Sequence, residues 1–242
     1  MVAVLFGWLW WFVLPFRRRL AVASYQRAFP GRDPGELRQG VGEVCRGYLD
    51  LLRGRYGRLE GGALAAGGAL ALAGHLSCWD LALVSGARQI PATIFVKTPS
   101  NRLAAWIIAA LRRRADIELL PPQGSLPAAE AALDRGRLVI FVQDQRHNAG
   151  IAVPFFGQPA LTSAAFAALA FRRRPRILGI EQGYEADGGF VMRLRALSID
   201  IPDDRDIAIP AVTAASQRFY EEAIGRRPYA WWWLHDRWKR PA

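Results

Sequence analysis

Strand-like and helix-like segments alternate through most of the chain after residue 62, and this alternation constrains the fold most strongly. Short apolar runs of this kind are typical of buried strands. We expect strands at Ala69–Ala73, Ala92–Val96, Ile117–Leu120, Leu138–Val142, Arg176–Glu181 and Phe190–Leu197. We expect helices at Trp79–Ala87, Ser100–Arg113, Leu126–Arg135, Ser163–Arg173 and Ala211–Ile224. Strands joined through helices pair in parallel, so the sequence predicts an α/β fold with a mainly parallel central sheet flanked by helices.

The first strand-to-helix connection, Gly74-His75-Leu76-Ser77-Cys78-Trp79-Asp80, places a histidine five positions before a carboxylate. In one helix these side chains would diverge by roughly 140°, and in one strand they would point to opposite faces. His75 and Asp80 therefore meet only where a strand ends and a helix begins. A carboxylate that orients an imidazole makes it a general base. A surface histidine that caps a helix would have the same spacing, so spacing alone leaves both interpretations open.

A second polar stretch, Gln143 to Asn148, follows the strand expected at 138–142 and precedes a Pro-Phe-Phe-Gly turn at 154–157. Thr162 then has the position of a helix N-cap. Functional groups in open α/β sheets gather where strands end and helices begin, so this stretch and the His75 turn are the two candidate places for such groups. The alternative is a solvated loop with an incidental pairing of Asp144 with Arg146.

Three histidines, His75, His147 and His235, each have a carboxylate nearby. Adjacent side chains rarely face each other, which weakens the pairing of His235 with Asp236, and the loop around His147 is a less rigid platform. His75 is therefore the strongest candidate for a base.

An alternative interpretation is a metal site formed by His75, Asp80, Asp144 and His147. The chain lacks the HExxH arrangement and any Cys/His ligand cluster, so we expect no metal and no cofactor. Cys78 lacks the surroundings that activate a thiol. Two cysteines in all argue against a disulfide framework and fit a reducing compartment.

The formal net charge of +11 attracts polyanions, which include nucleic acid, anionic lipid and acidic protein partners. The sequence has no zinc-finger cysteine spacing and no aromatic RNP-type strand. We therefore expect no nucleic-acid partner and favour an anionic membrane surface or an acidic protein.

Val2 to Phe16 is an apolar run with three tryptophans, followed by Arg17-Arg18-Arg19. It is shorter than the roughly 20 residues of a membrane span. A signal peptide would carry its charge before the run, and a buried core helix would have to satisfy three indole N–H groups. We favour an anchor over residues 1–19, as a short span or an interfacial segment, with residues 20–242 as one cytoplasmic domain.

Two further stretches carry structural signals. Asp33-Pro34-Gly35-Glu36 has the pattern of a capping box at the start of a helix that continues to about Arg53. Tyr229 to Lys239 interleaves aromatic and basic residues. Such a stretch fits a membrane-interface contact and equally a C-terminal clamp packed on the sheet.

Together these stretches resemble the bacterial lipid A biosynthesis lauroyl/myristoyl acyltransferase family, within the glycerolipid acyltransferase superfamily. His75 to Asp80 is similar to its H-x4-D/E motif. Gln143-Asp144-Gln145, with Val153 to Gly157 and Thr162, resembles its second block, and Trp233 to Lys239 its C-terminal block. Arg17 to Leu52 resembles the helical stretch after the family's membrane anchor. The family more often has Gly-Asn-Trp-Glu where this chain has Ser77-Cys78-Trp79-Asp80.

The resemblance implies transfer of an acyl chain from an acyl carrier protein thioester, or less often acyl-CoA, to a lipid hydroxyl. It implies His75 as general base, oriented by Asp80, at the cytoplasmic face of the bacterial inner membrane. A non-catalytic membrane-binding homologue and a metal-dependent hydrolase are the alternatives. The substrate-binding residues that the resemblance implies are Lys97, Arg114, Asp144, Gln145, Arg146, Phe156 and Thr162.

Overall fold

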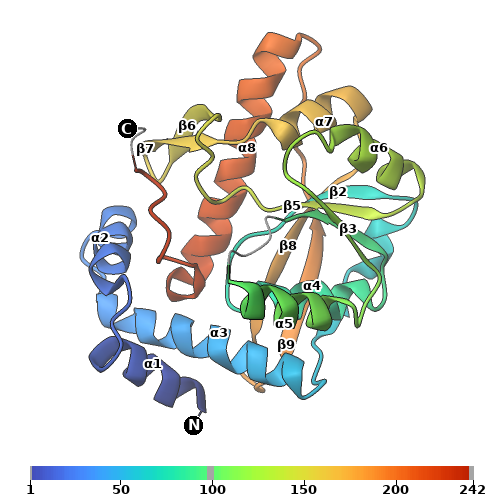
Figure 1. The fold of residues 1–242 in the computed structure, drawn as a ribbon. Helices are drawn as coiled ribbons and strands as arrows, with labels where there is room; N and C mark the ends of the chain where they lie inside the picture. The colour runs from blue at the N-terminus through green and yellow to red at the C-terminus, as the bar shows by residue number, and fades with distance from the viewer. Residues whose placement is uncertain (1, 97–100, 240–242) are drawn as a thin grey trace.

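A seven-stranded sheet forms the centre of the computed structural model, which describes residues 2–96 and 101–239 (Figure 1). The strand order is β1-β9-β8-β2-β5-β3-β4. The bounds are β1 Arg58–Glu60, β2 Ala69–Leu72, β3 Ala92–Phe95, β4 Ile117–Leu120, β5 Leu138–Phe141, β8 Ile177–Tyr184 and β9 Phe190–Ala196. Paired strands run parallel except β8 and β9. The predicted mainly parallel sheet is confirmed, and β1 is an additional edge strand.

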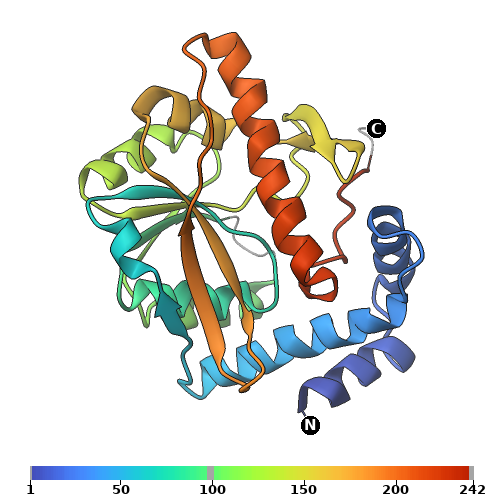
Figure 2. The same cartoon turned by 180° about the vertical axis from the view of Figure 1, so that it is seen from behind.

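Helices cover both faces of the sheet because its strands alternate apolar side chains between the faces. Leu70 and Phe141 belong to the core on one face, and Ala71 and Ile140 to the core on the other. The first face is covered by α6 (Leu126–Asp134), α7 (Ala165–Arg173) and α8 (Arg205–Arg226), and α8 crosses the view in Figure 2. The second is covered by α3 (Leu37–Leu52), α4 (Trp79–Ala87) and α5 (Arg102–Arg112).

The N-terminal run forms α1 (Val2–Phe12), which packs along α3 at backbone contact distance. A Cβ atom on Gly7 would stand 2.2 Å from the carbonyl oxygen of Arg38, and one on Gly42 would stand 2.1 Å from that of Ala3. Glycine at both positions therefore permits the close approach. Within residues 2–96 and 101–239, the structure contains no helix with the length and apolar character of a membrane span.

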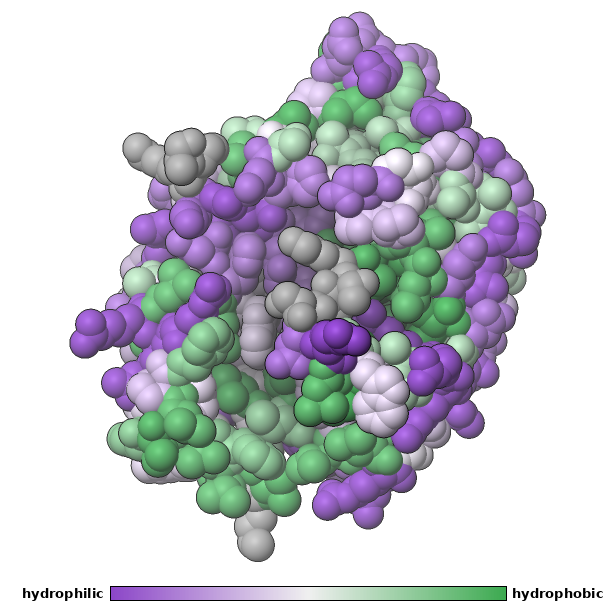
Figure 3. Space-filling model, viewed as in Figure 1, coloured by the Kyte–Doolittle hydropathy of each residue, from purple (hydrophilic) through white to green (hydrophobic). Residues whose placement is uncertain are grey.

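The outer face of α1 and the turn after it stay apolar and exposed. Leu5, Trp8, Phe12, Leu14 and Phe16 are all exposed. Figure 3 shows a hydrophobic surface at the lower left of the molecule, where Figure 1 places α1. A patch of this kind on a folded chain marks an interaction surface.

After α1 come α2 (Arg18–Ala28) and the 3₁₀ helix η1 (Pro34–Glu36), which leads into α3. Asp33 is the N-cap and Pro34 follows it, as predicted, but Glu36 does not complete the capping box. The Asp33 carboxylate accepts from the Gly35 amide at 2.8 Å, while the Glu36 carboxylate is bonded to Tyr25 and Arg32. The start of this helix is therefore a 3₁₀ turn that is tied to α2 through a side chain.

The sequence between β5 and α7 contains a separate antiparallel hairpin, β6 (Ile151–Phe155) and β7 (Gln158–Thr162), where we expected a loop and a turn. The chain after α8 continues through η3 (Pro228–Ala230) into a segment whose Trp231, Trp233 and Arg237 are all buried. Of the two alternatives for Tyr229 to Lys239, the structure therefore supports the clamp for these three side chains.

Candidate active site

The site begins with the strand register of β2 and β5. These neighbouring strands are parallel, and Leu72 pairs with Phe141. His75 lies three residues beyond Leu72, and Asp144 lies three residues beyond Phe141. Equal offsets from a parallel register bring the two side chains together at the carboxyl edge of the sheet.

His75 and Asp144 form a direct hydrogen-bonded pair. The Nδ1 atom of His75 lies 2.8 Å from Oδ1 of Asp144. A carboxylate only accepts hydrogen bonds, so Nδ1 carries a proton, and in the neutral imidazole the lone pair is on Nε2. The imidazole is 20% exposed while the carboxylate is fully buried, so part of the ring faces solvent and its partner does not. This is the arrangement of a general base with an orienting acid.

Two further donors fix Asp144. Its Oδ2 atom accepts the backbone N–H of His75 at 2.7 Å and the indole N–H of Trp231 at 2.7 Å. Burial alone would raise the pKa of Asp144, but the neighbouring His75 and the hydrogen bonds from His75 and Trp231 outweigh it and lower that pKa below its usual value. Asp144 is therefore held as a carboxylate in the interior.

Asp80 has other partners, which corrects the predicted contact with His75. Its Oδ2 atom accepts the hydroxyl of Tyr48 at 2.7 Å, and its Oδ1 atom lies 2.8 Å from the Arg112 guanidinium. The chain does turn from strand to helix between His75 and Asp80 as expected. Asp80, however, lies in the first turn of α4 and faces α3 and α5, whereas the sheet register delivers Asp144 to the imidazole.

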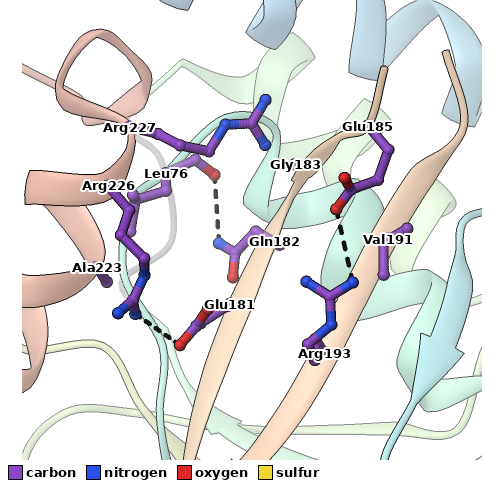
Figure 4. A pocket seen from close by; sticks show the side chains of 10 residues that line it. All are labelled: Leu76, Glu181, Gln182, Gly183, Glu185, Val191, Arg193, Ala223, Arg226 and Arg227. Carbon is purple, nitrogen blue, oxygen red and sulfur yellow. Dashed lines mark hydrogen bonds and ion pairs between the residues drawn. The ribbon is translucent and has the colours of Figure 1, made fainter. Parts of the chain in front are cut away.

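The backbone around His75 is held from two sides. The side-chain amide of Gln182 on β8 donates to the carbonyl oxygens of Gly74 at 2.8 Å and Leu76 at 3.2 Å. Figure 4 shows Gln182 reaching Leu76 beside a polar cavity, in which Arg226 pairs with Glu181 and Arg193 with Glu185. On the other side, the C-terminal segment Tyr229 to Lys239, here called the clamp, bonds to the same turn.

The contacts from the clamp run along the backbone of the turn. The Ser77 amide donates to the Ala230 carbonyl at 2.7 Å, and the Trp232 amide donates to the His75 carbonyl at 2.9 Å. Ser77 has a φ of 47°, a strained conformation for a residue with a side chain. The Trp79 ring meets the edge of the imidazole, with centroids 4.9 Å apart. The position of His75 is thus determined by segments far apart in the chain.

The rest of the polar stretch after β5 is anchored inward. Gln143 donates to the hydroxyl of Ser216 at 2.7 Å, and the Arg146 side chain donates to the Lys239 carbonyl at 2.8 Å. Gln145 is half-buried between them, and His147 is exposed. This stretch is therefore an ordered support for Asp144, and only part of it faces solvent.

His235 holds the same stretch as a neutral imidazole. Its Nε2 atom accepts the backbone N–H of Arg146 at 2.9 Å. Burial lowers the pKa of His235 from 6.5 to about 4. Protonation would place a hydrogen on the accepting nitrogen and break this bond.

Acid is therefore expected to weaken the fold. Between pH 6.5 and about 4 the unfolded chain binds a proton at His235 that the folded chain does not, so the free energy of unfolding falls as the pH is lowered through this window. The lowered pKa of Asp144 acts in the same direction at lower pH. His235→Gln, whose amide oxygen accepts without titrating, should flatten the loss in denaturant unfolding measured across this range. An unchanged slope would assign the acid sensitivity to other groups.

Phe156 and Thr162 lie on the β6–β7 hairpin. Phe156 has a φ of 48°, and its amide donates to the Glu221 carboxylate. Thr162 is not a helix N-cap, because α7 begins at Ala165 and Ala164 precedes it. The hydroxyl of Thr162 instead accepts from the guanidinium of Arg237 at 2.6 Å. Both residues therefore join the hairpin to α8 and to the clamp.

Of the two remaining predicted substrate contacts, only Arg114 can be placed, and it is bonded away from His75. Lys97 lies outside the described residues. The Arg114 guanidinium donates to the carbonyl oxygen of Leu51 at 2.6 Å, at the end of α3. The residues that sequence reasoning assigned no role at the site are Trp231 and Gln182, and no short-range pattern links either of them to His75.

An apolar cavity adjoins the site between α4 and the sheet. It extends from Gly74 and Trp79 to Leu83, Ile140 and Met192, and holds about 390 Å³ of space not filled by atoms, its opening included. Apart from Arg112 and Gln182, its lining consists of apolar residues and one glycine, so it suits an aliphatic chain. Within the part of the chain that the structure describes, no group of three His, Cys, Asp or Glu side chains is arranged to hold a metal ion.

Comparison with known protein families identifies the family of this chain. Residues 58–240 match the family model described as bacterial lipid A biosynthesis acyltransferase, whereas no curated protein gives a significant match. The matched range includes His75, Asp144 and the clamp, and covers well over half of the chain. The chain therefore belongs to the bacterial lipid A biosynthesis acyltransferase family and is an acyltransferase.

Proposed function

We propose that the protein transfers a fatty acyl chain from a thioester of acyl carrier protein or coenzyme A to a hydroxyl of a lipid A-type glycolipid. The observation that carries this proposal is the hydrogen bond of 2.8 Å between Nδ1 of His75 and Oδ1 of Asp144. It orients a partly exposed imidazole, and the neighbouring residues Gly74 and Trp79 line an apolar cavity, an arrangement that suits deprotonation of a hydroxyl next to an acyl thioester.

The proposed reaction uses this geometry. Nε2 of His75 takes the proton of the acceptor hydroxyl as its oxygen attacks the thioester carbonyl carbon. The tetrahedral intermediate collapses with cleavage of the carbon–sulfur bond, and the thiolate that leaves takes the proton back from His75. Asp144 stabilises the imidazolium in between, so no acyl-enzyme intermediate is needed. Asp80 is a positioning residue in this scheme, since it fixes the start of α4 and Arg112.

The acceptor is proposed to bind on the polar side of His75. Gln145 and Arg146 are partly exposed and directly follow Asp144, so they are suited to contact a sugar or a phosphate group. Phe156 and Thr162 contribute by shaping the adjoining hairpin. The net charge of +11 favours both an anionic lipid acceptor and an acidic carrier protein as donor.

The exposed face of α1 is proposed to lie in the cytoplasmic leaflet of the bacterial inner membrane. This face is apolar and is followed by Arg17, Arg18 and Arg19, a combination that suits an interfacial helix on an anionic surface. Replacing both Leu5 and Trp8 with Ser should lower binding to phosphatidylglycerol vesicles by about tenfold or more. Sedimentation with the vesicles measures this, and unchanged binding would remove α1 as the contact.

The function is tested by offering the purified protein acyl-carrier-protein thioesters and under-acylated lipid A precursor in detergent, with mass spectrometry of the lipid. One additional ester-linked chain is the expected product, with and without a chelator. Dependence on metal would instead favour the hydrolase alternative. Vesicle binding without any product would favour a non-catalytic homologue.

A further inference from the structure

Two apolar cavities lie end to end between α4 and the sheet. The first is the cavity that begins beside the His75 turn. The second lies at Gly86 and Ala87, in the last turn of α4, and is a narrow gap of about 200 Å³, its opening included, that does not hold a water molecule. Leu83, Ile140 and Met192 line both cavities. These three side chains therefore form the partition between them.

The strands give the pair of cavities a direction. Val142 and Ile94 line only the first cavity, whereas Leu138 and Ala92, which come earlier on the same two strands, line only the second. The passage thus leads from the carboxyl edge of the sheet, where His75 lies, toward the opposite edge. It follows α4 from Trp79 to Ala87, a length of about 12 Å at the usual helical rise.

Met192 closes this passage against a glycine. A Cβ atom on Gly86 would stand 2.4 Å from Sδ of Met192, so the end of the methionine side chain occupies the space that a side chain on α4 would need. Met192 is buried, and it crosses from β9 to the helix. An unbranched thioether adapts its shape readily, but its volume still fills the gap.

We propose that Met192 sets the maximum length of the acyl chain that the enzyme transfers, as the stop between the first cavity and the second. This inference rests on the proposed acyl transfer. The thioester carbonyl lies at His75, the aliphatic chain follows α4, and its methyl end meets Met192. A chain that extends beyond this point must displace the methionine side chain into the second cavity, so longer donors are transferred more slowly.

The test is a competition among saturated acyl-carrier-protein thioesters from decanoyl to palmitoyl, with the transferred chains identified by mass spectrometry. Met192→Ala joins the two cavities and should shift the preferred chain upward by about two or three methylenes, the volume of the atoms removed. The ratio of kcat/KM for the longer against the shorter donor should rise about tenfold. Met192→Phe should shift the preference downward.

The matched control is Leu194→Ala. Leu194 is the next residue of β9 on the same face, is equally buried and lines neither cavity. Truncation of Leu194 weakens the core but leaves the passage unchanged. The chain-length profile of this variant should therefore equal that of the wild type. If Met192→Ala fails to fold, Met192→Phe carries the test in the opposite direction.

The outcomes separate this inference from the proposed function. Wild-type protein without acyl transfer from any thioester would overturn the function itself. Active wild-type protein whose chain-length profile is unchanged in both Met192 variants, or shifted equally by Leu194→Ala, would overturn the role of Met192 alone.

Discussion

Replacing Asp144 with Asn is expected to lower kcat of acyl transfer by about 10³-fold with little loss of stability. The amide oxygen would take the position of Oδ2, because two N–H donors, from the His75 backbone and the Trp231 indole, point at that site. The amide nitrogen would then face Nδ1 of His75 and donate to it. That reverses the tautomer, places the proton on Nε2 and removes the base.

The matched control is Asp80→Asn, which changes the other carboxylate of the region. Asp80 has no bond to His75, so the activity of the folded protein should fall by far less, within about tenfold. The variant should instead lose about 3 kcal/mol of unfolding free energy, since the largely buried Arg112 loses its counterion. Steady-state kinetics and denaturant unfolding of the two variants measure this contrast. A loss of activity in Asp80→Asn as large as in Asp144→Asn, with stability retained, would contradict these assignments.

Much of the fold follows from local patterns. The apolar runs of β2, β3, β4 and β5 lie within one residue of their predicted bounds, and helices α4 and α6 do as well. A buried parallel strand is a continuous apolar segment between turn signals, and this signal needs no tertiary information. The helix predicted at Ala211 begins earlier, at Arg205, because the Asp204 side chain caps it and Pro210 is accommodated inside it.

The elements that the sequence did not indicate depend on strand pairing. β1 is a three-residue edge strand that pairs with β9, which follows more than a hundred residues later. β6 and β7 contain two prolines that pair with each other, Pro154 and Pro159, which local propensity excludes from strands. In both cases the pairing of the strands outweighs local preference.

The partner of His75 could not be read from spacing, but it follows from strand order. Asp80 is the carboxylate closest to His75 along the chain, and it lies at the start of the helix predicted to follow that strand. Once β2 and β5 are known to be neighbours in parallel register, Asp144 occupies the position equivalent to His75. Sequence patterns predict that both strands exist, whereas their adjacency is a property of the assembled sheet. The sequence therefore placed His75 at the end of a strand, but it did not indicate that the carboxylate bonded to it is Asp144.

The burial of the clamp also depends on long-range contacts that sequence patterns do not predict. The aromatic and basic pattern of Tyr229 to Lys239 fits a membrane contact and a buried segment equally well. The deciding feature is the isolated bridge between Leu76 and Trp231, together with the bond from the Trp231 indole to Asp144. These contacts join residues separated by more than 80 positions, beyond any periodic signal.

Replacement of His75 by Ala is the most direct test of the central claim, that this imidazole is the general base of acyl transfer. The variant keeps the Asp144 bonds to the backbone amide and to Trp231, so it should fold and bind anionic vesicles as the wild type does. Transfer of the acyl chain from the carrier-protein thioester to the lipid precursor should fall by about 10⁴-fold. Transfer that stays within tenfold of the wild-type rate, in a folded variant, would contradict the role of His75.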